Sequence, residues 1–187
     1  MLFVLVLLSN VLVTGSFYPL IYIAVAVLHE IGHLLAIWIC SHRMGQIKFV
    51  GFGIRIKNKD VYSYRNEIVI SASGPMVNIV FGLCGLFLYS IYSRVWIAHV
   101  IFASIAYAIL NLLPISPLDG YKIISATLYR SMSYHTAKML LRFIGGLSLG
   151  LIVLSLIFVM ANDFINYSLV PIFCVVAIGA INQIING

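Results

Sequence analysis

Residues 27–35, VLHEIGHLL, form an HExxH motif inside an uninterrupted apolar run. Histidines four residues apart lie on one face of a helix, so His29 and His33 can bind the same metal ion. Glu30 follows the first histidine and is placed to act as a general base toward a water at that metal. A charge in the middle of a bilayer costs about 2.5–3.5 kcal/mol, so ionisable residues in an apolar helix usually have a function. The motif predicts a metal-dependent hydrolase.

The composition is that of an integral membrane protein. Of the 187 residues, 63% are hydrophobic and only 9% are charged, and the mean hydropathy is +1.10. These values lie outside the usage of soluble globular proteins, and they predict an all-α polytopic membrane protein. A transmembrane helix needs about 20 apolar residues. Six segments are candidates, the first of them short: 1–16, 17–40, 68–92, 95–113, 141–160 and 164–185.

The basic residues are distributed unequally between the two sides of these six spans. Of the 11 Lys and Arg residues, all except Arg94 fall on the side of the loops 41–67 and 114–140. The positive-inside rule makes that side cytoplasmic. We therefore expect a multi-pass protein of the cell membrane with both termini in the cytoplasm. His33 precedes the end of its span by seven residues, which places the active site about 10 Å inside the cytoplasmic face. Since orientation explains the net charge of +6, we expect no nucleic-acid binding.

Between the second and third spans, apolar and basic residues alternate over 47–56, with glycines between the runs. This pattern predicts a small β-hairpin at the cytoplasmic interface, with a further turn at 58–60. The hairpin edge could pair with an extended substrate, or the hairpin could only orient the protein. The mixed stretch 119–140 predicts one or two short interfacial helices. Without a repeat or a linker, we expect a single domain over 1–187.

A catalytic zinc site needs a third protein ligand. The chain has five carboxylates, and Asp119 differs from the others because Pro114 and Pro117 precede it. Prolines lack a backbone donor and force the fourth span out of helix. The helix from Arg94 to Asn111 is about 26 Å long, so it ends below the surface of a hydrocarbon core of about 30 Å.

Asp119 should therefore lie on a non-helical continuation of that span, at a depth similar to that of His33. Non-helical backbone at such a depth must be packed in protein or line a wet cavity. The depths predict that Asp119 completes a metal site with His29 and His33.

These motifs resemble the signatures of the site-2 protease family, whose members are intramembrane zinc metalloproteases. The first is HEIGH at 29–33, and the second is Asn-x-x-Pro-x-x-x-x-Asp-Gly at 111–120. The segment GPMVN at 74–78 resembles a third, weaker element of the family. The order and spacing are most similar to the sporulation branch, typified by the stage IV protease that processes a sigma-factor precursor.

The resemblance implies one Zn²⁺ per chain, with Glu30 as the general base and three ligands: His29, His33 and Asp119. It implies that Asn111 supports the substrate carbonyl or its oxyanion. Asn78 would line the site, although an amide at that position could simply bond a neighbouring helix.

Two residues would shape the loop before the third ligand, namely Pro114 and Gly120. The chain departs from the family pattern at Tyr121, where many members have a second glycine. It also ends at Gly187, so we expect no C-terminal regulatory domain.

The predicted function is regulated intramembrane proteolysis by a single metalloprotease domain. The expected partners are a membrane-associated protein substrate, such as a sporulation sigma-factor precursor, regulatory membrane proteins and the lipid bilayer. The alternative is a transporter or channel in which the same His, Glu and Asp residues form an ion pathway. A scaffold without activity is disfavoured because no motif residue is missing. A zinc hydrolase requires the order His-Glu-x-x-His, which an ion pathway does not.

Overall fold

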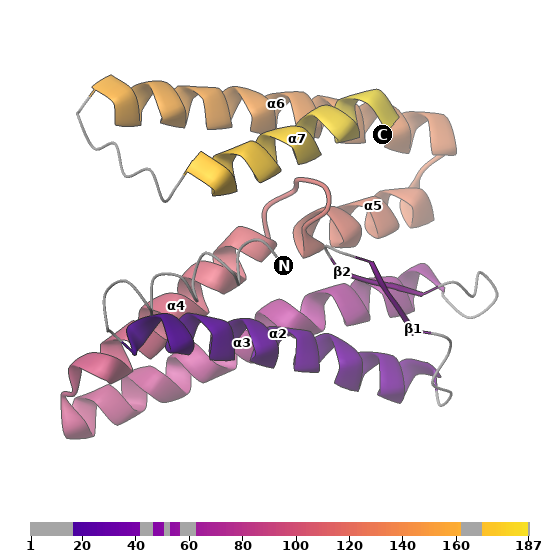
Figure 1. Ribbon diagram of the computed structural model, residues 1–187. Helices are drawn as coiled ribbons and strands as arrows, with labels where there is room; N and C mark the ends of the chain where they lie inside the picture. The colour runs from indigo at the N-terminus through magenta and orange to yellow at the C-terminus, as the bar shows by residue number, and fades with distance from the viewer. Residues whose placement is uncertain (1–16, 42–46, 51–52, 57–62, 162–169, 187) are drawn as a thin grey trace. The chain divides into compact units, whose positions relative to one another are not determined.

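The computed structural model describes residues 17–41, 47–50, 53–56, 63–161 and 170–186. The expected first span at 1–16 and the expected turn at 58–60 lie outside these residues. The chain divides into two compact units, Met1–Leu112 and Leu113–Gly187, whose elements are labelled in Figure 1. The single domain expected over the whole chain stays a prediction.

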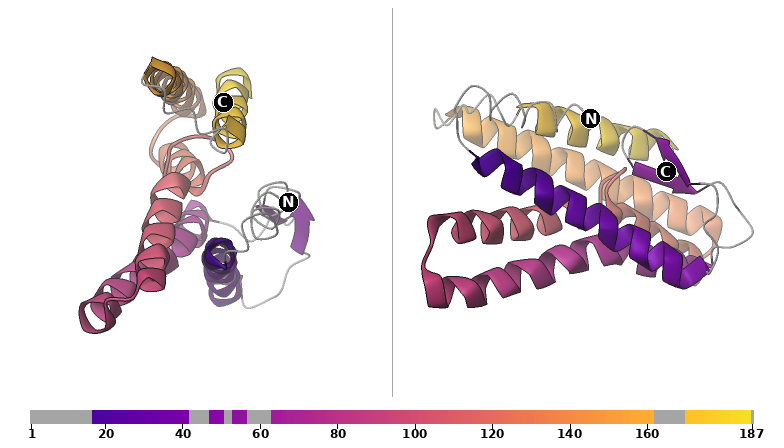
Figure 2. Two further views of the ribbon diagram at one scale, coloured as in Figure 1. Left: turned by 60° about the vertical axis from the view of Figure 1, so that its left-hand side comes forward. Right: turned by 60° about the horizontal axis from the view of Figure 1, so that its bottom comes forward.

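Within its described residues, the first unit contains three helices that pack against one another: α2 (Tyr18–Ser41), α3 (Tyr64–Tyr92) and α4 (Val95–Asn111). Helices α3 and α4 form an antiparallel pair, and α2 lies across it (Figure 2). The turn between α3 and α4 is tight. Ser93 adopts the left-handed conformation, with a φ of 46°, and its N–H donates to the carbonyl of Tyr89 at 2.9 Å. This geometry ends α3 and reverses the chain.

Glycines allow α3 to approach α4 closely. A Cβ at Gly82 would lie 3.0 Å from Cγ1 of Ile105, and a Cβ at Gly85 would lie 2.9 Å from Cγ1 of Ile101. Small residues at such positions are typical of helix contacts in membrane proteins, where close backbone approach gives the packing energy.

Two short strands follow α2 in the sequence. Strand β1 (Ile47–Val50) pairs antiparallel with β2 (Gly53–Ile56), and Ile47 lies opposite Ile56. These are the strands seen within the described residues, which are otherwise mainly helical. The placement of this pair at a membrane interface stays a prediction.

The second unit contains α5 (Asp119–Ser131), α6 (Tyr134–Ala161) and α7 (Val170–Asn186), with α6 packed against both α5 and α7. The loop that precedes α5 inserts an apolar side chain into the core of this unit. Ile115 is 3% exposed and clusters with Ile152 of α6 and Ala180 of α7. The loop is therefore fixed by α6 and α7 of its own unit.

Helix α7 also holds the loop backbone through a buried amide. Gln183 accepts a hydrogen bond from the Ser116 N–H at 3.2 Å and donates one to the carbonyl of Leu141 at 2.8 Å. The next peptide bond, Ser116–Pro117, is cis. The loop passes so close to α7 at Gly179 that a Cβ there would collide with the Ser116 carbonyl oxygen.

Replacing Gly179 by alanine should therefore destabilise the protein by at least about 1–3 kcal/mol, the usual effect of overpacking. The colliding atom belongs to the backbone and cannot swing aside, so either the loop or α7 must move. Thermal unfolding of the purified protein measures the effect. Gly146→Ala is the matched control, because a Cβ at Gly146 meets nothing within 4 Å. An unfolding midpoint equal to that of the wild type would contradict the close contact.

The predicted fold class, with six transmembrane helices, needs correction. Within the described residues, three helical segments are long and apolar enough to cross a membrane: Tyr18–Cys40, Tyr64–Tyr92 and Tyr134–Ser155. Two further apolar helical segments are shorter, Val95–Asn111 and Val176–Ile185. The 17 residues of α4 extend about 26 Å, less than the hydrocarbon thickness of about 30 Å. For the described residues, apolar composition alone therefore overcounted the spans.

The boundaries of two other predicted segments also change. Asp119 was expected on non-helical backbone, but it is the first residue of α5. The interfacial helices expected over 119–140 are α5 and the first part of α6, because α6 already begins at Tyr134.

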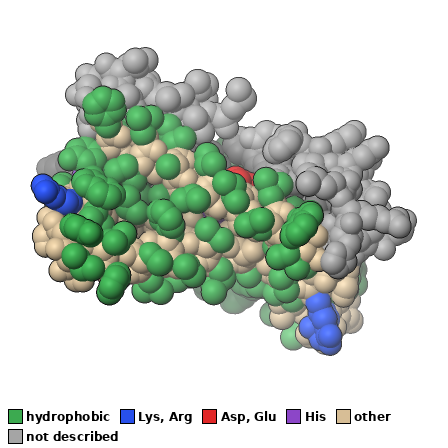
Figure 3. Space-filling model, turned by 90° about the horizontal axis from the view of Figure 1, so that it is seen from below, with side chains coloured by type: hydrophobic (Ala, Val, Ile, Leu, Met, Phe, Trp, Pro, Cys, Tyr) green, Lys and Arg blue, Asp and Glu red, His purple; other side chains and the backbone are tan. Residues whose placement is uncertain are grey.

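Large apolar side chains cover the outer surface of the first unit. Figure 3 shows a face that is mostly hydrophobic, with Lys and Arg side chains only near its two ends. Among the exposed residues are Trp38 of α2, Phe87 of α3 and Phe102 of α4, each more than half exposed. Soluble monomers rarely expose contiguous apolar surface of this extent. The surface and the long apolar helices are those of a membrane protein.

Candidate metal centre

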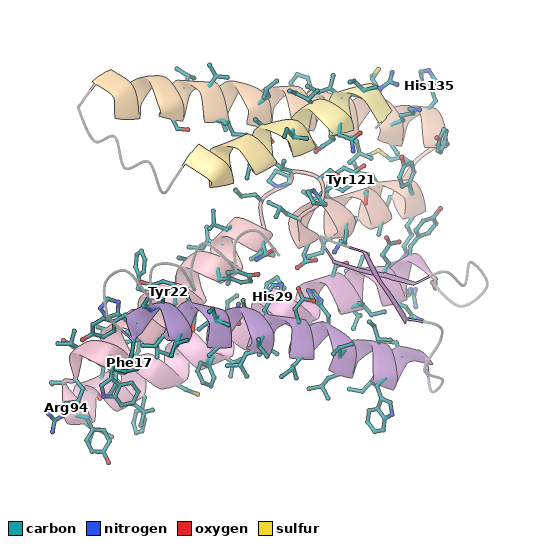
Figure 4. The ribbon with its side chains drawn as sticks, viewed as in Figure 1. Phe17, Tyr22, His29, Arg94, Tyr121 and His135 are labelled. Carbon is teal, nitrogen blue, oxygen red and sulfur yellow. The ribbon has the colours of Figure 1, made fainter. Side chains whose placement is uncertain are left out.

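His29 of the HExxH motif lies midway along α2 (Figure 4). His33 follows about one turn later on the same face of the helix. His29 is 2% exposed and His33 is 8% exposed. Their Nε2 atoms are 3.1 Å apart, and their rings lie edge to face at 4.7 Å between centroids. The i, i+4 spacing therefore places the two nitrogens side by side, as predicted.

This separation fits a shared metal ion. Two imidazole nitrogens bound at 2.0–2.1 Å to a tetrahedral zinc lie about 3.3 Å apart. The two histidines can thus act as neighbouring ligands with little movement of either ring.

The other ring nitrogen of His33 is held by α3. Nδ1 of His33 lies 2.8 Å from the carbonyl oxygen of Ile70. The Ser73 hydroxyl donates to the same carbonyl at 2.6 Å and lies 3.5 Å from Nδ1. Because a carbonyl only accepts, Nδ1 carries the proton, which leaves Nε2 as the ring nitrogen of His33 that could bind a metal ion. Such a partner orients a metal-binding histidine.

His29 contacts both α3 and α4. The Asn78 amide nitrogen of α3 lies 3.3 Å from Nδ1 of His29, and the ring of Tyr107 from α4 packs edge to face at 5.0 Å between centroids. Asn78 is completely buried. Three helices of the first unit therefore converge on this ring.

Two glycines let α3 approach the histidines. A Cβ at Gly74 would lie 2.5 Å from Nε2 of His33 and 2.8 Å from Nε2 of His29. A Cβ at Gly32 on α2 would lie 3.2 Å from the Gly74 Cα and 2.9 Å from the Ser73 carbonyl oxygen. Helices α2 and α3 thus cross at a glycine contact that leaves open the space beside both nitrogens.

Glu30 lies on the flank of the same face, about 60° around α2 from His33. Its side chain is exposed, and no hydrogen bond or ion pair involving it is seen among the described residues. The carboxylate is therefore available to a ligand, as a general base must be.

Asn111 is the last residue of α4 and is half-buried. Its amide nitrogen donates to the carbonyl of Tyr107 at 3.0 Å, one turn earlier on the same helix. Since the Tyr107 ring contacts His29, the end of α4 belongs to the surroundings of the histidines. An amide nitrogen carries two protons, and Tyr107 takes one of them.

The remaining predicted residues belong to the second unit. Pro114 lies in the loop before α5, and Gly120 is buried in the first turn of α5. Asp119 begins that helix, is 3% exposed and pairs with Lys122 at 2.7 Å. Tyr121, also in α5, has its pKa raised above the ordinary value by burial and secondarily by Tyr129, so its hydroxyl is neutral at pH 7.

His29, His33 and Asp119 are all buried, and each offers one atom of a type that binds metal ions. The sequence motifs did not indicate Tyr107 or Gln183, although these residues hold His29 and the loop before Asp119, respectively. Both are single residues outside any motif, so only the packing of the helices reveals them.

The comparison with solved structures defines the class of fold. The chain is similar to the site-2 protease from Methanocaldococcus jannaschii, with a TM-score of 0.67 over 98% of this chain and 86% of that chain, at 19% sequence identity. No family model matches the sequence, and no curated protein matches it. The likeness shows that the chain has a site-2 protease fold. The narrower resemblance to the sporulation branch stays a prediction.

Proposed function

We propose that the protein is an intramembrane zinc metalloprotease that hydrolyses peptide bonds of a membrane-associated protein. The observation that carries the proposal is the buried pair of Nε2 atoms of His29 and His33, 3.1 Å apart, with an exposed Glu30 on the flank of the same helix face. The site-2 protease fold supports the same function.

Zinc would be held by His29, His33 and Asp119. The two histidines have the separation that tetrahedral zinc requires. Asp119 is supported by its buried carboxylate and by the resemblance of its segment to the family motif. The proposed stoichiometry is one zinc per chain.

The proton transfers fall to Glu30. Zinc, when bound, supplies a Lewis acid that polarises the peptide carbonyl and makes a water molecule more acidic. Glu30 accepts a proton from the attacking water and passes it to the nitrogen of the leaving amine. The remaining N–H of Asn111 is the donor that would support the carbonyl oxygen as it gains negative charge.

The proposed location is the cell membrane, with the active site near the cytoplasmic face. Basic residues concentrated in the loops 41–67 and 114–140 support this orientation, and both termini would then be cytoplasmic. The proposed partners are a membrane-associated protein substrate, of which a sporulation sigma-factor precursor is one candidate, and regulatory membrane proteins.

Metal analysis of the purified protein tests the proposal. The wild type should contain one zinc per chain, and His33→Ala should bind zinc at least about 100-fold more weakly, since even a residue that only orients a ligand contributes 10–100-fold. His135→Ala is the matched control, because His135 is exposed on α6 in the second unit and should leave zinc binding unchanged. A wild type that binds no zinc would overturn the protease function and favour the ion pathway.

A further inference from the structure

Gln183 is a buried amide on the otherwise largely apolar helix α7, with 2% of its surface exposed. Its two polar groups have partners in different elements. Oε1 accepts from the N–H of Ser116 in the loop before α5, and Nε2 donates to the carbonyl of Leu141 on α6. Because an N–H only donates and a carbonyl only accepts, these partners fix the orientation of the amide. The side chain thus bridges α6 and the loop.

Two glycines bring the three segments close enough for this bridge. A Cβ at Gly145 of α6 would lie 3.1 Å from Cγ and 3.2 Å from Cδ of Gln183, so the side chain lies directly on the α6 backbone. Gly179 precedes Gln183 by one turn on the same face of α7, and it is the position where the Ser116 carbonyl oxygen approaches the helix. Helix α7 therefore contacts both the N–H and the carbonyl of Ser116.

A short, closed turn connects Ser116 to the proposed third ligand. The N–H of Leu118 donates to the carbonyl of Ile115 at 2.8 Å. Both of these side chains pack in the core that α6 and α7 form. Only Pro117 and Leu118 separate Ser116 from Asp119, the first residue of α5. The place of Asp119 within its unit is therefore set by a turn that α6 and α7 hold at three consecutive contacts: Ile115, Ser116 and Leu118.

We propose that Gln183 is a positioning residue for Asp119. By holding the N–H of Ser116, it keeps the turn in the one arrangement from which the Asp119 carboxylate can serve as a ligand. The proposal rests on the zinc site of the proposed function, and it adds a residue that lies outside every motif. Without the amide, the turn can adopt other arrangements, and the apparent affinity for zinc falls with the fraction of molecules that are competent to bind.

The alternative role for Gln183 is to pack α6 against α7, as amides often do between apolar helices. Loss of such a contact would lower the thermal stability and leave zinc affinity unchanged. The two roles can be separated because the two hydrogen bonds of the amide reach different elements, and because another polar contact joins the same two helices without involving the loop.

Gln183→Leu removes both hydrogen bonds and should weaken zinc binding about 10–100-fold, the usual contribution of a residue that orients a metal ligand. Gln183→Glu keeps an oxygen that accepts from the Ser116 N–H whether or not the carboxyl is protonated, so it should recover most of the lost affinity. Competition with a chelator of known affinity measures zinc binding, and thermal unfolding shows whether each variant is folded.

Arg142→Met is the matched control. Arg142 on α6 donates to the carbonyl of Ile185 on α7 at 3.5 Å, so its substitution removes a polar contact between the same helices, and zinc affinity should stay unchanged. Wild-type affinity in a folded Gln183→Leu would overturn the proposed role. An equal loss of affinity in Arg142→Met, or a Gln183→Glu that binds zinc as weakly as Gln183→Leu, would also overturn it.

Hydrogen exchange of the Ser116 amide tests the proposal without measuring zinc. The amide should exchange slowly in the wild type, because its N–H is bonded to Gln183, and faster in Gln183→Leu. Exchange at the same rate in both proteins would show that Gln183 does not hold the loop. A wild type that binds no zinc overturns the proposed function, and this role with it, whereas unchanged zinc affinity in Gln183→Leu refutes only the role of Gln183.

Discussion

Replacing Glu30 by glutamine is expected to lower the rate of peptide-bond cleavage by about 10²–10⁴-fold, the usual contribution of a general base. Glutamine has nearly the same size and the same position on α2, but it cannot accept a proton from water at neutral pH. The variant should retain one zinc per chain, because the proposed ligands His29 and His33 are unchanged. The rate is measured with purified protein and a membrane-protein substrate in detergent or vesicles.

Glu67→Gln is the matched control for this experiment. Glu67 is an exposed glutamate in the first turn of α3, within the same unit, and its substitution should leave the cleavage rate unchanged. Cleavage by Glu30→Gln at the wild-type rate would show that another group acts as the base. Loss of zinc together with activity would instead show that Glu30 supports the metal site.

The Glu30→Gln variant also offers a route to the substrate. It should bind a substrate and fail to cleave it, so membrane proteins captured with this variant and absent from the wild type are substrate candidates. A sigma-factor precursor among them would support the sporulation-type function.

The pairing of His29 with His33 could be predicted because it depends only on the periodicity of one helix. The long helices α2, α3 and α6 were also predictable, since each contains an apolar run longer than a bilayer requires. The start of α6 was missed, because its first turns carry polar residues and helix ends tolerate them. Asp119 was placed outside a helix because of the prolines, although an acidic residue two positions after Pro117 suits a helix N-terminus.

The partners of the two histidines could not be predicted, because they depend on the register between helices. His33 bonds to Ile70 and His29 to Asn78 only because α2 crosses α3 where Gly32 faces Gly74. A shift of α3 by a single residue would rotate these groups by about 100°. Nothing local in the sequence measures that register.

Gly74→Ala is expected to lower zinc affinity by more than about 100-fold, which exceeds the effect of losing one orienting partner. The added Cβ would lie 2.5 Å from Nε2 of His33 and 2.8 Å from Nε2 of His29, closer than nonbonded atoms can approach. The rings cannot easily turn away, because Ile70 and Asn78 hold their Nδ1 atoms.

Helix α3 could relieve the collision by moving outward, but its contact with Gly32 and the bond from His33 would then be lost. Either response moves the two nitrogens out of the geometry that a shared metal ion requires, so zinc affinity should fall. The free energy of unfolding should be affected less, since overpacking costs about 1–3 kcal/mol. Competition with a chelator measures the affinity, and Gly150→Ala, where a Cβ meets nothing within 4 Å, is the matched control. A methyl group beside both Nε2 atoms would disturb a metal ion bound to them. If Gly74→Ala bound zinc as tightly as the control, the two Nε2 atoms could therefore not be the ligands.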